Sequence, residues 1–177
     1  MKTVVTYQSK TGYTQKYAEW IAEELGADLY PISQVPVQKL AAYDVVIHGG
    51  SLFATGILGL KKIKNSLSDL QNKKVIVFGV GLTPVNAETV EKVQTQNFTA
   101  EELEKVRFFY FRGGFNFKAL SFFDRILMGI MRRFIERKQR QGKELTADEI
   151  GMLAVFDQAV DYTDRDAITE LISWARI

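Results

Sequence analysis

Short apolar runs alternate with helical patterns along this chain, and that alternation is the strongest constraint on its fold. Four runs have the length and β-branched content of buried parallel strands, namely Thr3–Tyr7, Asp44–His48, Lys74–Phe78 and Val106–Phe111. Asp28–Ile32 is a weaker fifth run. Helical segments between such runs imply parallel strands with helices on both faces of the sheet. The pattern therefore predicts a doubly wound α/β fold with five strands.

The predicted helices carry start and stop signals. Thr14–Leu25 has an apolar face that includes Tyr17 and Ile21, and Gly26 follows as a helix-stop signal. Further helices are predicted at Leu58–Leu67, at Asn86–Val93, from a capping box at Thr99–Glu102, and at Asp164–Ala175. We see no internal repeat and no linker, so we expect one domain over residues 1–177.

Composition narrows the class of protein. The 177 residues are 46% hydrophobic and 25% charged, with a net charge of +2, which is typical of a globular domain. No cysteine is present, which excludes disulfides, thiolate zinc sites and redox thiols. The chain starts directly with a strand and has no run of 18 uncharged apolar residues. We therefore expect no signal peptide, no membrane-spanning helix and a cytoplasmic location.

Ligands of such sheets bind beyond the carboxyl ends of the strands, at the switch point in strand order. The loops that follow the first, third and fourth predicted strands contain no Asp or Glu, and they are Gln8–Thr14, Gly49–Gly59 and Gly79–Val85. In the first loop, Ser9, Thr11 and Thr14 surround Gly12 just before a helix, an arrangement that suits a phosphate. Alternatively Thr14 is only the N-cap of that helix. The spacing alone leaves both interpretations open.

Several other sites are excluded by the residues. The chain lacks the G-x-x-x-x-G-K-[ST] phosphate loop, and Pro84 stands where a dinucleotide fingerprint needs its last glycine. His48 is the single histidine, which excludes a histidine pair or triad, and we expect it to pack in the sheet. A signalling receiver needs acidic residues where Tyr7-Gln8 and His48-Gly49 stand. We expect neither catalytic side chains nor a metal site, while a cofactor-free scaffold stays open.

Ser9-Lys10-Thr11-Gly12-Tyr13-Thr14 resembles the [ST]-x-T-G-x-T phosphate loop of flavodoxins. The resemblance covers essentially the whole chain and implies the strand order 2-1-3-4-5, FMN as cofactor, and electron transfer to a redox partner protein. It places the FMN phosphate at Ser9–Thr14. It places the isoalloxazine ring at two further segments, which comprise Ser51, Leu52, Phe53, Ala54, Thr55, Gly81, Leu82 and Thr83.

Two features of these flanking segments depart from ordinary flavodoxins. Gly81-Leu82-Thr83-Pro84 lacks the aromatic residue that usually stacks on the flavin, so Phe53 is the candidate stacking residue. Electron-carrier flavodoxins also surround the flavin with acidic residues, and here those loops have none. Less negative charge nearby lowers the cost of an anionic reduced flavin. We therefore expect a less negative potential for the fully reduced couple than a typical carrier shows.

A basic, aromatic insertion, predicted at residues 113–160, follows the fifth strand. Lys118–Lys143 contains eight Lys or Arg against Asp124 and Glu136, a local excess of +6. Its apolar residues fit an ordinary buried helix, or a membrane-surface helix that contacts anionic lipid. A nucleic-acid partner is not expected, because this basic helix carries no known nucleic-acid recognition motif. Gly113–Lys143 is the candidate docking surface for a partner protein, a membrane quinone or a planar substrate.

Parts of the insertion resemble menaquinone-dependent protoporphyrinogen oxidases, which are flavodoxin-like enzymes of haem biosynthesis. These parts are Phe123-Asp124-Arg125, the apolar run to Arg132-Arg133, and Val160–Asp164. Gly142–Val160, with a capping box at Thr146–Glu149, departs from those enzymes and is closer to flavodoxin-domain proteins of Gram-positive bacteria. Such an oxidase, acting at the membrane surface, is the alternative function, and whether the chain is an enzyme stays open.

Overall fold

The computed structural model describes residues 1–53, 56–156 and 159–177. These residues form two compact units, which we call the sheet unit (Met1–Gly113 with Thr163–Ile177) and the insertion unit (Gly114–Tyr162). A single domain over residues 1–177 stays a prediction. Among the described residues, no helix has the length and apolar content needed to cross a membrane.

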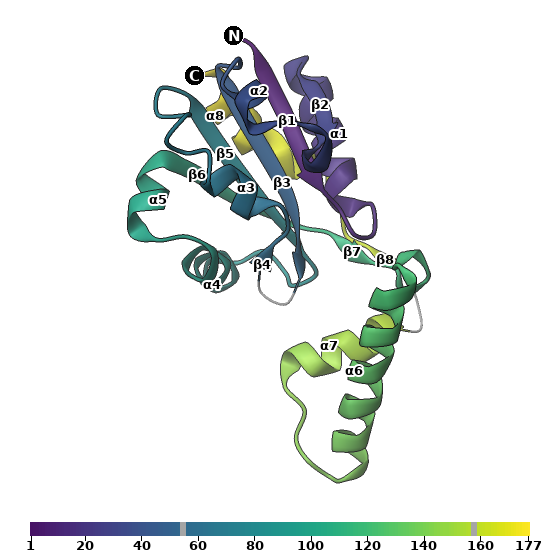
Figure 1. The fold of residues 1–177 in the computed structure, drawn as a ribbon. Coiled ribbons are helices and arrows are strands. Elements are labelled where there is room, and N and C mark those ends of the chain that lie inside the picture. The colour runs from purple at the N-terminus through teal and green to yellow at the C-terminus, as the bar shows by residue number, and fades with distance from the viewer. Residues whose placement is uncertain (54–55, 157–158) are drawn as a thin grey trace. The chain divides into compact units, whose positions relative to one another are not determined.

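The sheet unit is built on a parallel sheet, shown in Figure 1. Its strands lie in the order β2-β1-β3-β5-β6, and β4 pairs with β3 in the antiparallel direction. Their bounds are β1 Thr3–Gln8, β2 Asp28–Pro31, β3 Val45–Phe53, β4 Gly56–Ile57, β5 Lys74–Gly81 and β6 Val106–Arg112. Without the short β4 this is the predicted order 2-1-3-4-5, so the predicted fold class is confirmed.

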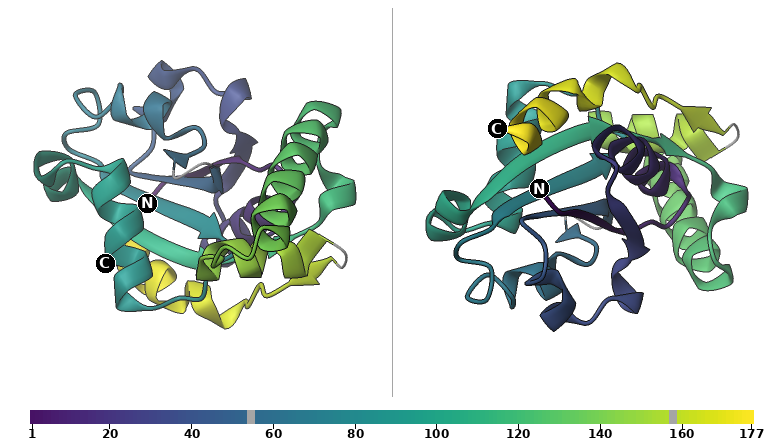
Figure 2. Two further views of the ribbon diagram at one scale, coloured as in Figure 1. Left: turned by 90° about the horizontal axis from the view of Figure 1, so that it is seen from below. Right: turned by 90° about the horizontal axis from the view of Figure 1, so that it is seen from above.

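Helices cover both faces of this sheet, as the views in Figure 2 show. Because successive strand residues point to opposite faces, Val4 and Val5 of β1 belong to two different cores. One core packs against α1 and α8, and the other packs against α3, α4 and α5. The helix bounds are α1 Tyr13–Leu25, α2 Val37–Leu40, α3 Leu60–Lys64, α4 Ala87–Asn97, α5 Ala100–Lys105 and α8 Thr169–Arg176, with short 3-10 turns at Ile32–Gln34 and Asp166–Ile168.

Two strands, β3 and β5, extend well past their predicted ends, while β1 and β6 each end one residue later than predicted. β3 continues past His48 to Phe53 and pairs with β4, with Leu52 opposite Ile57. β5 likewise continues past Phe78 to Gly81. The predicted loops therefore begin inside strands. Glycines are typical of loops, but here Gly49 and Gly50 lie inside β3 and allow close packing against Phe78 and Ile57.

Gly49→Ala is expected to destabilise the sheet unit by about 1 to 3 kcal/mol, the usual cost of overpacking a core. A Cβ at Gly49 would overlap the ring of Phe78, which is fully buried. Urea denaturation monitored by circular dichroism measures the loss. Shortening the ring in Gly49→Ala/Phe78→Leu should recover part of the stability relative to the sum of the single changes. Strictly additive effects would show that the ring is not the obstacle.

The helix predicted at Leu58–Leu67 is shorter in the structure, where α3 spans Leu60–Lys64. Ser66, which is fully buried, donates its hydroxyl to the carbonyl oxygens of Lys62 (2.8 Å) and Ile63 (2.9 Å). A serine that bonds to the backbone in this way competes with the helical pattern. The helix-forming residues around it are therefore not enough to extend α3.

The described residues of the insertion unit form two helices and a small antiparallel sheet. Its elements are β7 Gly114–Phe115, a 3-10 turn at Phe117–Ala119, α6 Phe122–Arg140, α7 Ala147–Phe156 and β8 Val160–Asp161, with β7 paired to β8. Helix α7 begins at the predicted capping box, in which the Thr146 N–H donates to Glu149 and the Glu149 N–H donates to the Thr146 hydroxyl. The β7–β8 pair was not predicted, because two-residue strands carry no readable periodicity.

Candidate functional site

The loop between β1 and α1 leaves a helix N-terminus open. The N-cap of α1 is Gly12, whose φ of 92° is a left-handed conformation that favours glycine, and among the described residues no side-chain hydrogen bond caps the helix. Thr14 lies inside the first turn, so it is not the N-cap and that alternative is wrong. The first turn also contains no acidic residue. Its backbone N–H groups, which have no intrahelical acceptors, favour an anion.

Hydroxyl groups join this loop to the end of β3. The Thr14 and Ser51 hydroxyl oxygens are 2.8 Å apart, and the Lys10 N–H donates to the Ser51 hydroxyl at 3.2 Å. Within the loop, the Gly12 N–H donates to the Ser9 hydroxyl at 3.0 Å. Thr14 is fully buried, while Thr11 is only partly buried. The structure thus brings together most of the predicted phosphate-loop residues and the first residue of the next predicted segment.

The end of β3 also meets the end of β5 and the first loop. A Cβ built on Gly81 would lie 2.8 Å from Leu52 Cδ1, which shows how closely these two predicted segments approach. The Lys10 ammonium lies 4.5 Å from the centre of the Phe53 ring. The ring of Phe53, the predicted stacking residue, thus makes a cation–π contact with Lys10 in this structure. The predicted contacts Ala54 and Thr55 lie outside the described residues.

Two side chains of β6, neither of them among the predicted site residues, hold the segment after β5. Arg112 donates from Nε to the Leu82 carbonyl at 3.1 Å, and the Tyr110 hydroxyl donates to the Thr83 carbonyl at 2.8 Å. Burial raises the pKa of Tyr110 to about 12, so its hydroxyl remains a donor at neutral pH. Tyr110 belongs to a predicted strand and Arg112 directly follows it. The sequence signal that points to them is their position at the carboxyl end of the fifth predicted strand, beside the loop that follows the fourth.

These features fit FMN on the chemistry of the donors. The uncapped N-terminus of α1 and the neighbouring hydroxyls provide hydrogen-bond donors for a phosphate, and a Cβ at Gly12 would meet nothing within 4 Å, so this position is open. Lys10 belongs to the first of the converging segments, and Arg112 donates a hydrogen bond to the third. None of the three loops has an acidic residue. An anionic group is therefore favoured.

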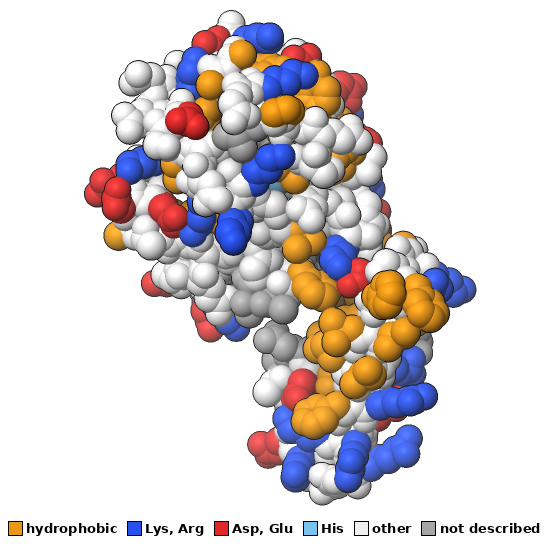
Figure 3. Space-filling model, viewed as in Figure 1, with side chains coloured by type: hydrophobic (Ala, Val, Ile, Leu, Met, Phe, Trp, Pro, Cys, Tyr) orange, Lys and Arg blue, Asp and Glu red, His pale blue; other side chains and the backbone are white. Residues whose placement is uncertain are grey.

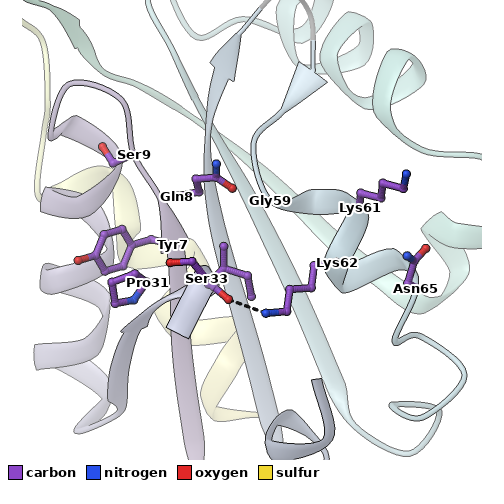
Figure 4. Close-up of a pocket in the computed structure, with 10 residues that line it drawn as sticks. Tyr7, Gln8, Ser9, Pro31, Ser33, Gly59, Lys61, Lys62 and Asn65 are labelled. Atoms are coloured by element: carbon purple, nitrogen blue, oxygen red, sulfur yellow. Dashed lines mark hydrogen bonds between the residues drawn. The ribbon is translucent and has the colours of Figure 1, made fainter. Parts of the chain in front are cut away.

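A cavity of about 600 Å³ lies at the ends of β1 and β2 and beside α3, as Figure 4 shows. Its lining comprises Tyr7, Gln8, Ser9, Pro31, Ile32, Ser33, Gly59, Lys61, Lys62 and Asn65. Among the described residues, Ser9 is the one that both lines this cavity and belongs to the predicted cofactor contacts. The Lys62 ammonium reaches across to the carbonyl oxygens of Ile32 (2.8 Å) and Val35 (2.6 Å). That charge is thus used to tie α3 to the segment after β2.

His48 lies fully buried in β3, in agreement with the expectation that it packs in the sheet. Its Nδ1 is 3.1 Å from the Thr6 hydroxyl oxygen, and its Nε2 is 2.9 Å from the Leu58 carbonyl oxygen. Because a carbonyl only accepts, Nε2 carries the proton and Nδ1 is an acceptor for the Thr6 hydroxyl, whose single proton is shared with the Ile47 carbonyl at 3.2 Å. Burial lowers the pKa of His48 to about 4, so the imidazole is neutral at pH 7.

The solved structures that match this chain include flavodoxins. Oxidised flavodoxin 2 from Bacillus cereus is 24% identical, with 62% of this chain and 84% of that chain covered and a TM-score of 0.40. The Trp repressor binding protein from Bacillus subtilis is 14% identical, with 65% and 85% covered and a TM-score of 0.47.

Two comparisons of the sequence itself also match flavodoxins. A curated flavodoxin from Maridesulfovibrio salexigens is 35% identical over 92 residues, which span 45% of this chain and 63% of that flavodoxin. The alignment thus covers less than two thirds of the relative's length. The family model described as a flavodoxin domain matches residues 4–142, well over half of the chain. The chain therefore belongs to the flavodoxin-domain family, and FMN is its cofactor.

Proposed function

We propose that this protein transfers electrons between redox partners through bound FMN. The observation that carries the proposal is the convergence of three acid-free segments, from β1, β3 and β5, at the uncapped N-terminus of α1. When bound, FMN supplies the redox chemistry, and the protein supplies binding and electrostatics. No protein side chain is assigned a catalytic role.

The residues that would hold the cofactor are proposed as follows. Ser9, Lys10, Thr11, Gly12, Tyr13 and Thr14 would bind the phosphate, through backbone N–H groups and hydroxyls. Ser51–Thr55 and Gly81–Thr83 would flank the isoalloxazine ring. The Ser51 hydroxyl supports this arrangement, since it contacts both Lys10 and Thr14 and so fixes the first segment to the second. Tyr110 and Arg112 would hold the third segment in place.

An absorbance spectrum of the purified protein, taken before and after FMN addition with dialysis between, tests the cofactor. We expect retained flavin bands near roughly 370 and 450 nm. Reduction of the loaded protein and reoxidation by a partner protein then test electron transfer. A colourless protein that releases all its FMN would contradict the proposal and leave a scaffold as the remaining function.

The electrostatics of the segment after β5 give a further prediction. Thr83, which is exposed, offers a position for one added negative charge in a segment that has none. In Thr83→Asp the potential of the fully reduced couple should become more negative by on the order of 50 mV, because the charge repels added electrons. Thr83→Asn is the neutral control of similar size. Equal potentials for the two variants in a dye-coupled redox titration would contradict this prediction.

The partner of the cofactor is also proposed by class. A redox partner protein is the first candidate, while a quinone or another planar substrate is the second. The oxidase alternative stays a prediction that rests on the resemblance of the insertion. Reoxidation by a menaquinone analogue, measured with and without protoporphyrinogen, separates these cases. Quinone-dependent loss of protoporphyrinogen would favour the oxidase, and reoxidation by a protein partner alone would favour the carrier.

A further inference from the structure

Helix α6 presents an apolar face that the described residues of the insertion unit leave exposed. Seven of its side chains are between 38% and 80% exposed, and they are Phe122, Phe123, Ile126, Leu127, Ile130, Met131 and Phe134. Their spacing of three and four residues places them along one side of the helix. Figure 3 shows them as a continuous strip of hydrophobic side chains. Within the described part of the insertion unit, this face therefore does not match the interpretation of α6 as an ordinary buried helix.

The core of the insertion unit lies on a different side of α6. Met128 and Ile135, seven residues apart, are its buried side chains, and Met128 shares a core cluster with Phe156 of α7. The Lys138 ammonium lies 2.7 Å from the Glu149 carboxylate of α7. The contacts among the described residues of the unit therefore use one side of α6 and leave the apolar face exposed.

Basic residues accompany this face. Helix α6 contains six Lys or Arg against two acidic residues, a net charge of +4. Asp124 accepts a hydrogen bond from the Ser121 hydroxyl at the helix start, and Glu136 pairs with Arg132 at 2.8 Å. In the part of the chain that the structure describes, the ion pairs of α6 use Arg132 and Lys138. Four exposed guanidinium groups remain for an anionic partner, those of Arg125, Arg133, Arg137 and Arg140.

We propose that α6 docks the protein on a bilayer surface that contains anionic phospholipid. The phenylalanine and aliphatic side chains enter the boundary between headgroups and acyl chains, and the arginines bind lipid phosphates. A second copy is disfavoured as the occupant, because two faces of equal charge would repel each other. A nucleic acid would neutralise the arginines but leave the apolar strip exposed to water. A bilayer surface is complementary to both features.

Co-sedimentation of the full chain with vesicles tests the proposal. One set of vesicles contains phosphatidylcholine with about 30 mol% phosphatidylglycerol, and the other contains phosphatidylcholine alone. We expect binding to the anionic vesicles, with weakening at high salt. Phe123→Ser/Phe134→Ser should weaken partitioning by at least about 10-fold, because two large exposed aromatics are lost.

A charge variant and a matched control complete the design. Arg133→Gln/Arg137→Gln should weaken anionic-vesicle binding roughly 30-fold, which converts about 1 kcal/mol per cation. Lys92→Gln/Lys105→Gln removes two exposed charges from helices α4 and α5 and should leave binding unchanged. Circular dichroism and vesicle-free sedimentation of each variant establish that it is folded and not aggregated.

The outcomes separate the occupants. Absence of wild-type binding to anionic vesicles would overturn the proposal, as would equal binding by wild type and both α6 variants. A monomer–dimer shift in light scattering that only the phenylalanine variant abolishes would assign the face to a second copy. RNA or DNA binding without vesicle binding would assign it to a nucleic acid. The proposal does not depend on the cofactor, so the FMN-free protein should bind vesicles equally and the two proposals can fail separately.

Discussion

Replacing Thr11 and Thr14 together by alanine is expected to weaken FMN binding by about 2 to 6 kcal/mol, a rise in Kd of roughly 30-fold to 10⁴-fold. Each hydroxyl that bonds to a charged phosphate contributes about 1 to 3 kcal/mol. The backbone N–H groups at the start of α1 would remain and would retain part of the affinity. Titration of FMN, followed through its fluorescence, measures the change.

The control for this prediction follows from the burial of Thr14. Because its side chain is fully buried beside Ser51, alanine would remove packing as well as a hydroxyl. Thr14→Val, which keeps the volume, separates the two effects. Riboflavin has no phosphate, so its affinity should change much less than that of FMN. Thr95→Ala removes an exposed helical hydroxyl elsewhere and should change neither. Unchanged FMN affinity in the Thr11/Thr14 double variant would place the phosphate at another site.

Features encoded by neighbouring residues were predicted correctly from the sequence. The helix that ends at Gly26 does so in a left-handed conformation, and the capping boxes at Thr99 and Thr146 have both of their reciprocal hydrogen bonds. These signals depend on a few consecutive residues and on backbone geometry, so tertiary structure does not alter them. The strand order followed from the resemblance to flavodoxins, and the parallel arrangement from the strand–helix alternation.

Features that depend on distant residues were not predicted. The extension of β3 into a hairpin requires β4 to pair with it, and the support of Leu82 and Thr83 comes from β6, about 30 residues away. No local pattern reports such contacts. The sequence does not distinguish a buried from an exposed apolar face of α6, because an apolar helical stripe looks the same in sequence whether it meets a core or a membrane.

The burial of the single histidine couples the stability of the sheet unit to pH. His48 has a pKa of about 4 in the folded protein against an ordinary value of 6.5, and burial is the cause. Between these values the unfolded chain binds a proton that the folded chain does not. The free energy of unfolding therefore rises with pH across this window and falls as the medium is acidified. Protonation of His48 in the unfolded chain therefore lowers the free energy of unfolding by about 3 kcal/mol by pH 4.

Urea denaturation of the wild type between pH 4 and pH 8 should show this loss, but carboxylates titrate in the same range. His48→Gln provides the reference, because glutamine does not titrate and its amide can still donate to the Leu58 carbonyl. The stability of the wild type should fall by about 3 kcal/mol more than that of the variant as the pH decreases from 8 to 4. Since the chain has one histidine, its imidazole proton resonance reports the pKa directly. A resonance that titrates near pH 6.5 in the folded protein, or parallel pH profiles for the two proteins, would contradict a buried neutral imidazole at the centre of the sheet.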